Sequence, residues 1–273
     1  MNFENIMMAF KSMSKDGSTT WVWFDNFKAV VSGVDSSLIL TSAWNNIKMA
    51  FMTTIIGMPL NILYGYYLHK KRFGSTAIRI VYMLPNMVSG VVMTMLFMKF
   101  MEVGVPMFYL EATGEVLPNL LRSEDTAFGI QVFYALWLGF SSSLIIYSNA
   151  MNAIDTSIFE AGKIDGCTTF DEITRLVVPL IFPTLSTYFI TATAGLFTMS
   201  GSLFLFYGLN NVPKNTYFLG FYMFKIAMTG DLTAYPHAAA VSVMITIVSV
   251  PMTLFVRWFL NRIDPMRDNY ADI

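Results

Sequence analysis

Five long stretches of the chain contain no charged residue, and they constrain the possible fold more than any other feature of the sequence. The stretches are residues 49–68, 80–98, 126–154, 176–213 and 232–256. A helix needs about 20 apolar residues to cross the hydrocarbon core of a bilayer, whereas strands of a membrane barrel alternate apolar and polar residues. The sequence therefore predicts an all-α, polytopic integral membrane protein, a helical bundle with five visible transmembrane helices.

Composition supports this prediction and excludes several other classes of protein. The 273 residues are 55% hydrophobic and only 13% charged, whereas soluble domains carry about 25% charged residues. The net charge of −1 gives no indication of nucleic-acid binding. One cysteine, Cys167, and two histidines offer no disulfide, metal site or catalytic cluster. The chain also lacks a G-x-x-x-x-G-K-[ST] motif, so we expect no ATP site and no cofactor on it.

The loops between the runs predict the orientation of the spans, because short cytoplasmic loops carry an excess of Lys and Arg. The loop after the first run holds four basic residues, Lys70, Lys71, Arg72 and Arg79. Residues 102–127, in the loop after the second run, hold Arg122 as their single basic residue, together with five acidic residues. The first loop is therefore predicted to be cytoplasmic and the second extracytoplasmic.

This orientation predicts three parts of the chain. Residues 1–42 form an extracytoplasmic segment, residues 43–260 a transmembrane domain, and residues 261–273 a cytoplasmic tail. Residues 1–42 contain no signal peptide that would carry them across the membrane. We therefore expect a further span to precede the visible ones. A true five-span protein with a translocated N-terminal segment is the alternative.

A charged loop, residues 155–178, separates the third and fourth runs and is predicted by alternation to be cytoplasmic. Ser157 followed by Glu160 has the spacing of a capping box, in which each side chain bonds a backbone N–H group of the other residue. A short helix is therefore predicted to begin near Ile158. Gly166 can adopt a positive φ, which would end this helix.

A second short helix is predicted immediately after this turn. Thr168 and Thr169 are good N-cap residues, and the helix would run from Phe170 to Leu176 before the chain re-enters the membrane at Pro179. Two short helices joined by a sharp turn have no role toward lipid. The charged loop is therefore predicted to present a surface to another protein in the cytoplasm.

The charged loop resembles the cytoplasmic EAA loop in the permease subunits of bacterial ABC importers. The family pattern is roughly E-A-A-x-x-x-D-G-A followed by prolines, and its positions are occupied here by Glu160, Ala161, Gly162, Asp165 and Gly166. Gly162 stands in place of the third alanine, and Cys167 in place of the alanine after the glycine. Both replacements are small, so close packing against a partner is expected to be preserved.

Other segments resemble the sugar permeases of this family. WVWFDNFKAVV, residues 21–31, is similar to the segment before their second span, and Trp44-Asn45-Asn46 is similar to the start of that span. YGLNNVPKNTYFLGFYMFKIA, residues 207–227, is similar to part of their outer loop, with asparagines in place of its glycines. The chain has no glycine-rich tail of the kind found in G-like permeases. It therefore resembles the F-like permease of maltose-type, carbohydrate-uptake importers.

The resemblance implies a multi-pass subunit in the bacterial cytoplasmic (inner) membrane that moves a sugar or oligosaccharide by alternating access. It implies contact with lipid and three protein partners: a second permease subunit in a heterodimer, an ABC ATPase dimer that holds ATP and Mg, and an extracytoplasmic solute-binding protein. The charged loop would be the coupling loop on the ATPase, where Glu160 and Asp165 would pair with basic groups and Gly166 would make the required turn.

Two sets of residues are candidates for a substrate path, because each set shares one face of an expected helix. The sets are Tyr134, Trp137 and Ser141 on the third run, and Tyr188, Thr191, Gly195, Thr198 and Ser202 on the fourth. Aromatic rings can stack on the apolar face of a sugar, and hydroxyl groups can exchange hydrogen bonds with it. Ordinary helix packing also uses small and hydroxyl residues and is the alternative explanation.

Two other functions are alternatives to sugar import. An importer for a peptide, a polyamine or an anion would share the charged loop. An ion-coupled secondary transporter should show buried acidic residues or broken repeats, and the sequence shows neither clearly.

Overall fold

The computed structural model describes residues 3–266, apart from the side chains of Asn5, Ser141 and Ser142. Residues 267–273 of the predicted cytoplasmic tail therefore lie outside the described residues. The chain divides into two compact units. The first unit comprises Met1–Ala50, Thr94–Gln131 and Ala194–Met252, and the second comprises Phe51–Met93, Val132–Thr193 and Thr253–Ile273.

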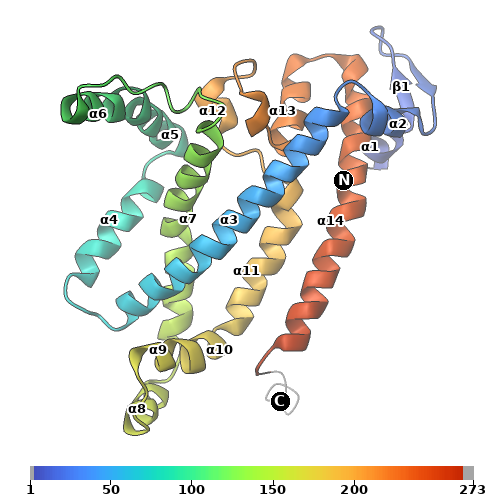
Figure 1. Cartoon of the computed structure of the whole chain (residues 1–273). Coiled ribbons are helices and arrows are strands. Elements are labelled where there is room, and N and C mark those ends of the chain that lie inside the picture. Colours follow the sequence, from blue (N-terminus) through green and yellow to red (C-terminus); the bar gives the residue numbers. More distant parts are fainter. Residues whose placement is uncertain (1–2, 267–273) are drawn as a thin grey trace. The chain divides into compact units, whose positions relative to one another are not determined.

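Four helical segments are long and apolar enough to cross a membrane. They are α3 (Ser36–His69), Gly90–Thr113, α7 (Ala127–Asn152) and Leu232–Ile263, which contains α14 (Tyr235–Ile263). A fifth span is obtained if a bent pair, Thr169–Leu180 and Phe182–Thr198, is counted as one. The prediction of a helical, multi-pass membrane protein is confirmed, with four to five spans among the described residues (Figure 1).

The predicted helix over residues 80–98 is wrong in its bounds. The chain forms α4 (Ser75–Met87), and Val88 then has an extended backbone with φ −91° and ψ 145°. The ladder of i→i−4 hydrogen bonds ends there, and α5 begins at Gly90. From Gly90 the chain stays helical to Thr113 through α5 (Gly90–Lys99), a π-helical turn (Phe100–Gly104) and α6 (Val105–Thr113). Part of the expected outer loop is therefore helix.

The single run predicted over residues 176–213 is also broken. The short helix α10 (Val178–Leu180) is followed by α11 (Phe182–Gly195), and the helices on the two sides of the break are bent by 67°. Pro183 explains this bend, because its ring has no N–H group and would clash with the carbonyl of Pro179 in a continuous helix. Beyond Gly195 the predicted run holds only a 3₁₀ turn, Leu196–Thr198, and the short helix α12 (Leu203–Tyr207).

The N-terminal part of the first unit contains a small sheet that the sequence did not predict. It follows α1 (Phe3–Met8) and consists of β1 (Lys11–Met13) and β2 (Thr19–Trp21), which pair antiparallel with Lys11 opposite Trp21. The helix α2 (Asp25–Ser32) follows the sheet. A buried cluster in this unit contains Ala9, Val30, Tyr222, Ala240 and Val241. This packing joins residues 3–32 to α13 (Leu219–Thr229) and α14.

One fully buried asparagine on α3 joins three segments of the first unit. The Asn46 amide nitrogen donates to the Leu196 carbonyl at 2.6 Å, and the Asn46 amide oxygen accepts from the Leu219 N–H at 3.0 Å. Leu196 begins a short 3₁₀ turn, Leu196–Thr198, and Leu219 begins α13. Both bonds satisfy backbone groups that lack a partner at a helix end.

Candidate functional site on the charged loop

The first helix of the charged loop, α8 (Thr156–Ile164), begins two residues before the predicted start. Asp155, and not Ser157, is the N-cap residue, and its carboxylate accepts a hydrogen bond from the Ser157 N–H at 2.9 Å. This hydrogen bond holds the pKa of Asp155 below its usual range. A carboxylate at a helix N-terminus also interacts favourably with the helix dipole, which explains why Asp155 replaces Ser157 in this role.

The turn between the two helices of the loop is formed as predicted. Gly166 has φ +79°, a left-handed conformation that costs little only for glycine. Thr168 and Asp171 then form a capping box, in which each side chain bonds the backbone N–H of the other at 3.2 Å. This box starts α9 (Thr169–Asp171), which continues into a π-helical turn, Glu172–Val177. The predicted second helix thus exists and starts one residue earlier.

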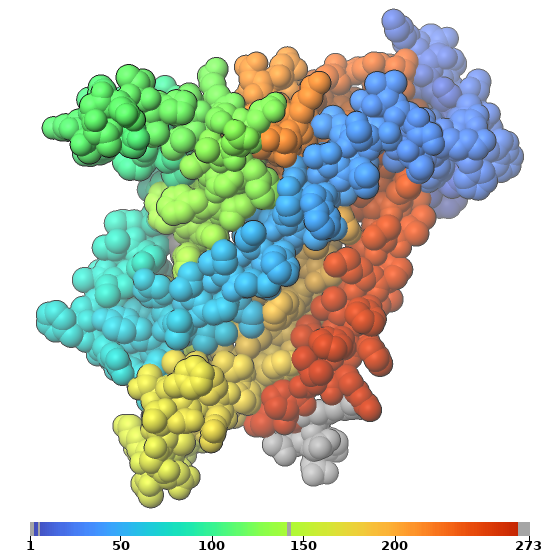
Figure 2. Space-filling model, viewed as in Figure 1, coloured from blue at the N-terminus to red at the C-terminus, as the bar shows by residue number. Residues whose placement is uncertain are grey.

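The end of the loop presents acidic and apolar groups together. Its exposed residues are Glu160, Ala161, Lys163, Ile164, Asp165, Gly166, Thr168, Thr169 and Phe170, so one basic side chain lies among the acidic and apolar ones. Ile164 is 87% exposed and Phe170 is 73% exposed, so two large apolar side chains lie among the charged ones. Figure 2 shows the charged loop, in yellow, at the surface of the protein. The arrangement suits a surface that offers both apolar and charged groups.

Gly162 faces the chain itself and not this exposed end. It is buried, and a Cβ atom there would lie 2.9 Å from Leu176 Cδ1 and 3.7 Å from Cys167 Sγ. The small size of Gly162 is therefore needed where α8 packs against the second half of the charged loop. The prediction that Gly162 is small in order to pack against a partner protein is therefore wrong, because Gly162 packs within the charged loop.

Gly162→Ala is expected to change the free energy of unfolding by less than about 1 kcal/mol, because the gain in helix propensity, about 0.5–1 kcal/mol, offsets the displacement of one Leu176 methyl group. Gly162→Leu is expected to cost about 1–3 kcal/mol through overpacking. Thermal denaturation of the purified protein in detergent would measure both, with the exposed Ala161→Leu as the control. Equal stability of Gly162→Leu and wild type would contradict the inward packing.

A buried carboxylate holds the loop to the end of α3. Glu172 is only 5% exposed. The Tyr66 hydroxyl donates a hydrogen bond to Glu172 Oε2, and the Lys70 ammonium lies 2.6 Å from the same oxygen. The sequence did not predict this cluster. The one sequence feature that could have indicated this cluster is an acidic residue, Glu172, close to an apolar run that begins at Leu176.

Aromatic and apolar packing surrounds this cluster in the second unit. The Phe159 ring on α8 lies 4.9 Å from the His69 ring, and His69 Nδ1 lies 2.9 Å from the Asn152 side-chain oxygen. A buried hydrophobic cluster continues from there: Ile62, Tyr66, Tyr147, Met151, Phe159, Val177, Ile181 and Leu185. The base of the charged loop is therefore fixed, while its other end is exposed.

The expected substrate-path faces are only partly present as continuous helix faces. Tyr134 is buried with its ring 6.2 Å from Trp137, and the Tyr188 ring lies 6.1 Å from Tyr147. The Ser141 side chain lies outside the described residues. The second face is not continuous, because α11 ends at Gly195. Thr198 lies in the 3₁₀ turn and Ser202 precedes α12 (Leu203–Tyr207), so neither extends the face formed by Tyr188 and Thr191.

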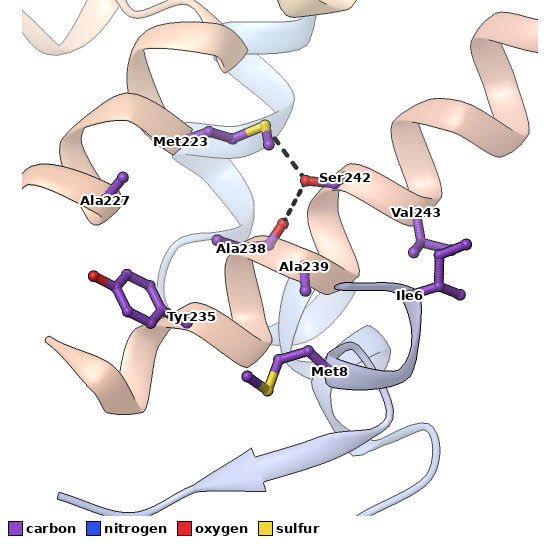
Figure 3. Close-up of a pocket in the computed structure, with 9 residues that line it drawn as sticks. All are labelled: Ile6, Met8, Met223, Ala227, Tyr235, Ala238, Ala239, Ser242 and Val243. Carbon is purple, nitrogen blue, oxygen red and sulfur yellow. Dashed lines mark hydrogen bonds between the residues drawn. The ribbon is translucent and has the colours of Figure 1, made fainter. Parts of the chain in front are cut away.

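Two cavities in the first unit differ in chemistry. One, of about 370 Å³, is lined mainly by apolar side chains of α1, α13 and α14. Its Ser242 hydroxyl donates to the Ala238 carbonyl at 2.9 Å and contacts the Met223 sulfur at 3.9 Å (Figure 3). Because that hydroxyl is already bonded, this cavity suits an apolar group better than a sugar.

The other cavity, of about 350 Å³, is lined by more polar side chains and was also not predicted. Its lining includes Asp35, Tyr217, Tyr222, Lys225 and His237. The Tyr222 hydroxyl donates to Asp35 at 3.2 Å, and the Lys225 ammonium donates to the Tyr217 hydroxyl at 3.2 Å. Hydrogen-bond donors and acceptors are therefore both present in the lining of this cavity.

Within residues 3–266, no group of three or more His, Cys, Asp or Glu residues could hold a metal ion.

Comparison with known proteins agrees with these features. The family model described as "Binding-protein-dependent transport system inner membrane component" matches residues 57–268. The chain is 26% identical to the multiple sugar-binding transport system permease protein MsmF of Streptococcus mutans, over 73% of this chain and 70% of that protein. It is 24% identical to the glucose import system permease protein GlcT of Saccharolobus solfataricus, over 93% of this chain and 90% of that protein.

A solved structure shares the fold. A chain of a bacterial ABC transporter involved in the import of the acidic polysaccharide alginate matches with a TM-score of 0.79. Its sequence identity is 18%, and the match covers 95% of this chain and 88% of that chain. A second structure of the alginate transporter, in complex with a periplasmic protein bound to an alginate pentasaccharide, matches with a TM-score of 0.77.

Proposed function

Because this chain belongs to the family of binding-protein-dependent transport system inner membrane components, we propose that it is a permease subunit of an ATP-driven importer for a sugar or oligosaccharide. The observation that carries the proposal is the charged loop. Its acidic and apolar end is exposed, while its base is held by Glu172, Lys70 and Tyr66 at the end of a membrane helix. Such a loop is suited to receive a force from a partner and pass it to the spans.

The proposed cycle needs a separate ATPase, since the chain has no phosphate-binding loop. Glu160 and Asp165 pair with basic groups in a groove of the ATPase dimer, which holds ATP and Mg. Closure of the ATPases on ATP moves the charged loop and shifts the spans from inward-open to outward-open. Residues 1–42 are proposed to be extracytoplasmic, residues 43–260 to form the transmembrane domain and residues 261–273 to lie in the cytoplasm.

Two further partners complete the proposed assembly. A second permease pairs with this chain in a heterodimer, and an extracytoplasmic binding protein delivers the solute. The alginate importer crystallised with its periplasmic binding protein supports this arrangement, because it shares the fold of this chain. The names of MsmF and GlcT support a sugar as the solute. Candidate contacts are Tyr134, Trp137, Ser141, Tyr188, Thr191, Thr198 and Ser202.

Purification of the tagged chain from its native membrane tests the assembly. We expect a second permease and an ATPase to co-purify with the wild type. Gly166→Pro should lose the ATPase and keep the second permease, because proline cannot adopt the φ of +79° at this turn. Gly230→Pro is the matched control, since Gly230 also ends a helix with positive φ, +66°, but lies outside the charged loop.

Three results would count against the proposal. The chain could purify alone or only with copies of itself, or Gly166→Pro could retain the ATPase, or Gly230→Pro could lose it equally. Uptake of labelled oligosaccharides, peptides, polyamines and anions by cells with and without the chain would then identify the solute class. Uptake of a non-sugar solute alone would overturn the sugar assignment and leave the importer assignment in place.

A further inference from the structure

Three side chains connect the charged loop to the end of α3 through one carboxylate oxygen. Glu172 Oε2 accepts a hydrogen bond from the Tyr66 hydroxyl and lies 2.6 Å from the Lys70 ammonium. The Glu172 side chain is 6% exposed and the Lys70 side chain 21% exposed. Hydrogen bonds to charged groups are stronger and more directional than apolar contacts, so this cluster permits only a narrow range of orientations.

The same lysine also contacts the first helix of the charged loop. The Lys70 ammonium lies 4.5 Å from the centre of the Phe159 ring, within the range of a cation–π interaction. Phe159 belongs to α8, whereas Glu172 belongs to the π-helical turn after α9. One residue directly after α3 therefore contacts both halves of the loop.

A neighbouring ion pair differs from the pair of Lys70 and Glu172 in the elements that it joins and in its exposure to water. Arg175 and Asp171 lie 3.3 Å apart, but they belong to the same short helical segment, and the Arg175 side chain is 77% exposed. A pair at i and i+4 stabilises its own helix and joins it to nothing else. The pair of Lys70 and Glu172 joins two separate elements and is largely removed from water.

We propose that Tyr66, Lys70 and Glu172 are positioning residues that make the charged loop and the inner end of α3 one mechanical unit. Displacement of the loop by the ATPase is then passed to α3 and not absorbed by bending of the loop. This inference rests on the proposed function. It differs from the contact with the ATPase itself, which the exposed end of the loop makes. Loss of the cluster should therefore uncouple ATP hydrolysis from transport without releasing the ATPase.

The complete importer in proteoliposomes, with its loaded binding protein, provides the test. Glu172→Gln and Lys70→Met should keep the co-purified ATPase and basal ATP hydrolysis, while the solute moved per ATP hydrolysed falls at least 10-fold. The charge exchange, Lys70→Glu with Glu172→Lys, should regain at least a third of the wild-type ratio. Arg175→Gln, which removes the neighbouring ion pair, is the control and should stay within twofold of wild type.

A second experiment covers variants that assemble poorly. Lys70→Cys and Glu172→Cys are combined in a Cys167→Ala background and bridged by a short thiol cross-linker that a reductant cleaves. A linker is chosen because the native contact is made by two long side chains, whereas a direct disulfide needs Cα atoms within about 7 Å. The same purified sample should transport with the bridge intact and lose coupling when the bridge is cleaved.

The outcomes separate this inference from the proposed function. A wild-type chain without an ATPase or without uptake would overturn both. A coupled wild type whose Glu172 and Lys70 variants move solute at an unchanged ratio per ATP would overturn this inference alone. Equal transport by the bridged and cleaved forms would also overturn this inference alone. So would loss of the ATPase from every variant of the cluster, if the Arg175→Gln importer keeps its ATPase.

Discussion

Asn46→Leu is expected to lower the free energy of unfolding by about 2–5 kcal/mol, because a buried backbone donor or acceptor left unpaired costs about 1–3 kcal/mol. The leucine side chain removes the acceptor for the Leu219 N–H and the donor to the Leu196 carbonyl. Both groups are buried and sit at the ends of helical segments. The loss should separate α3 from α13 in the first unit and prevent transport.

Thermal denaturation in detergent, followed by the fraction of monodisperse protein, would measure this effect. Asn46→Asp should be intermediate, since it keeps the acceptor for Leu219 and loses the donor to Leu196. Ser37→Leu, at an exposed position of the same helix, should change stability by less than about 0.5 kcal/mol. An Asn46→Leu protein that unfolds at the wild-type temperature would show that neither bond matters.

Phe159→Ala should have the second large effect, a local loss of about 3–5 kcal/mol, which is typical for removing a buried aromatic side chain. Phe159 is 5% exposed and contacts both His69 and Lys70. Its loss should loosen α8 from the rest of the second unit. The ATPase should then be lost from the complex although Glu160 and Asp165 are unchanged.

Limited trypsin digestion would detect this change, because Lys163 is exposed on α8 and cleavage follows the population of the opened state. A local loss of about 3 kcal/mol corresponds to roughly 100-fold faster cleavage, at tenfold for each 1.4 kcal/mol. Phe170→Ala is the control for overall stability, since Phe170 is 73% exposed on the same loop. Equal cleavage of both variants would contradict the role of Phe159 as an anchor.

Local signals in the sequence were enough to predict the turns of the charged loop. The positive φ of Gly166 and the cap at Thr168 depend on residues within three positions of each other, and both predictions are confirmed. The cap at Ser157 was wrong because two acceptable caps lie within three residues, and pattern alone does not rank them. Asp155 is used because its carboxylate accepts from the Ser157 N–H.

Longer-range features could not be predicted in the same way. Tyr66 and Glu172 are 106 residues apart, and no periodicity in one sequence pairs them. Hydropathy also predicts where a chain is apolar and not where its helices break, so the breaks after Met87 and Leu180 were missed. Pro183 was a usable signal for the second break. The contacts of Glu160, Asp165 and the substrate-path residues stay predictions, because they require partners.

The threonines of α11 bear on the proposed substrate path, in which Thr191 is a candidate contact. Thr187, Thr191 and Thr193 each donate the hydroxyl proton to the backbone carbonyl four residues earlier, at 2.8–2.9 Å. Only lone pairs are then left to face a solute. A polyol can supply protons to such a surface, whereas a carboxylate or phosphate would meet oxygen against oxygen. On the proposed substrate path, these threonine hydroxyls would therefore favour a polyol over an anion without using a charged side chain.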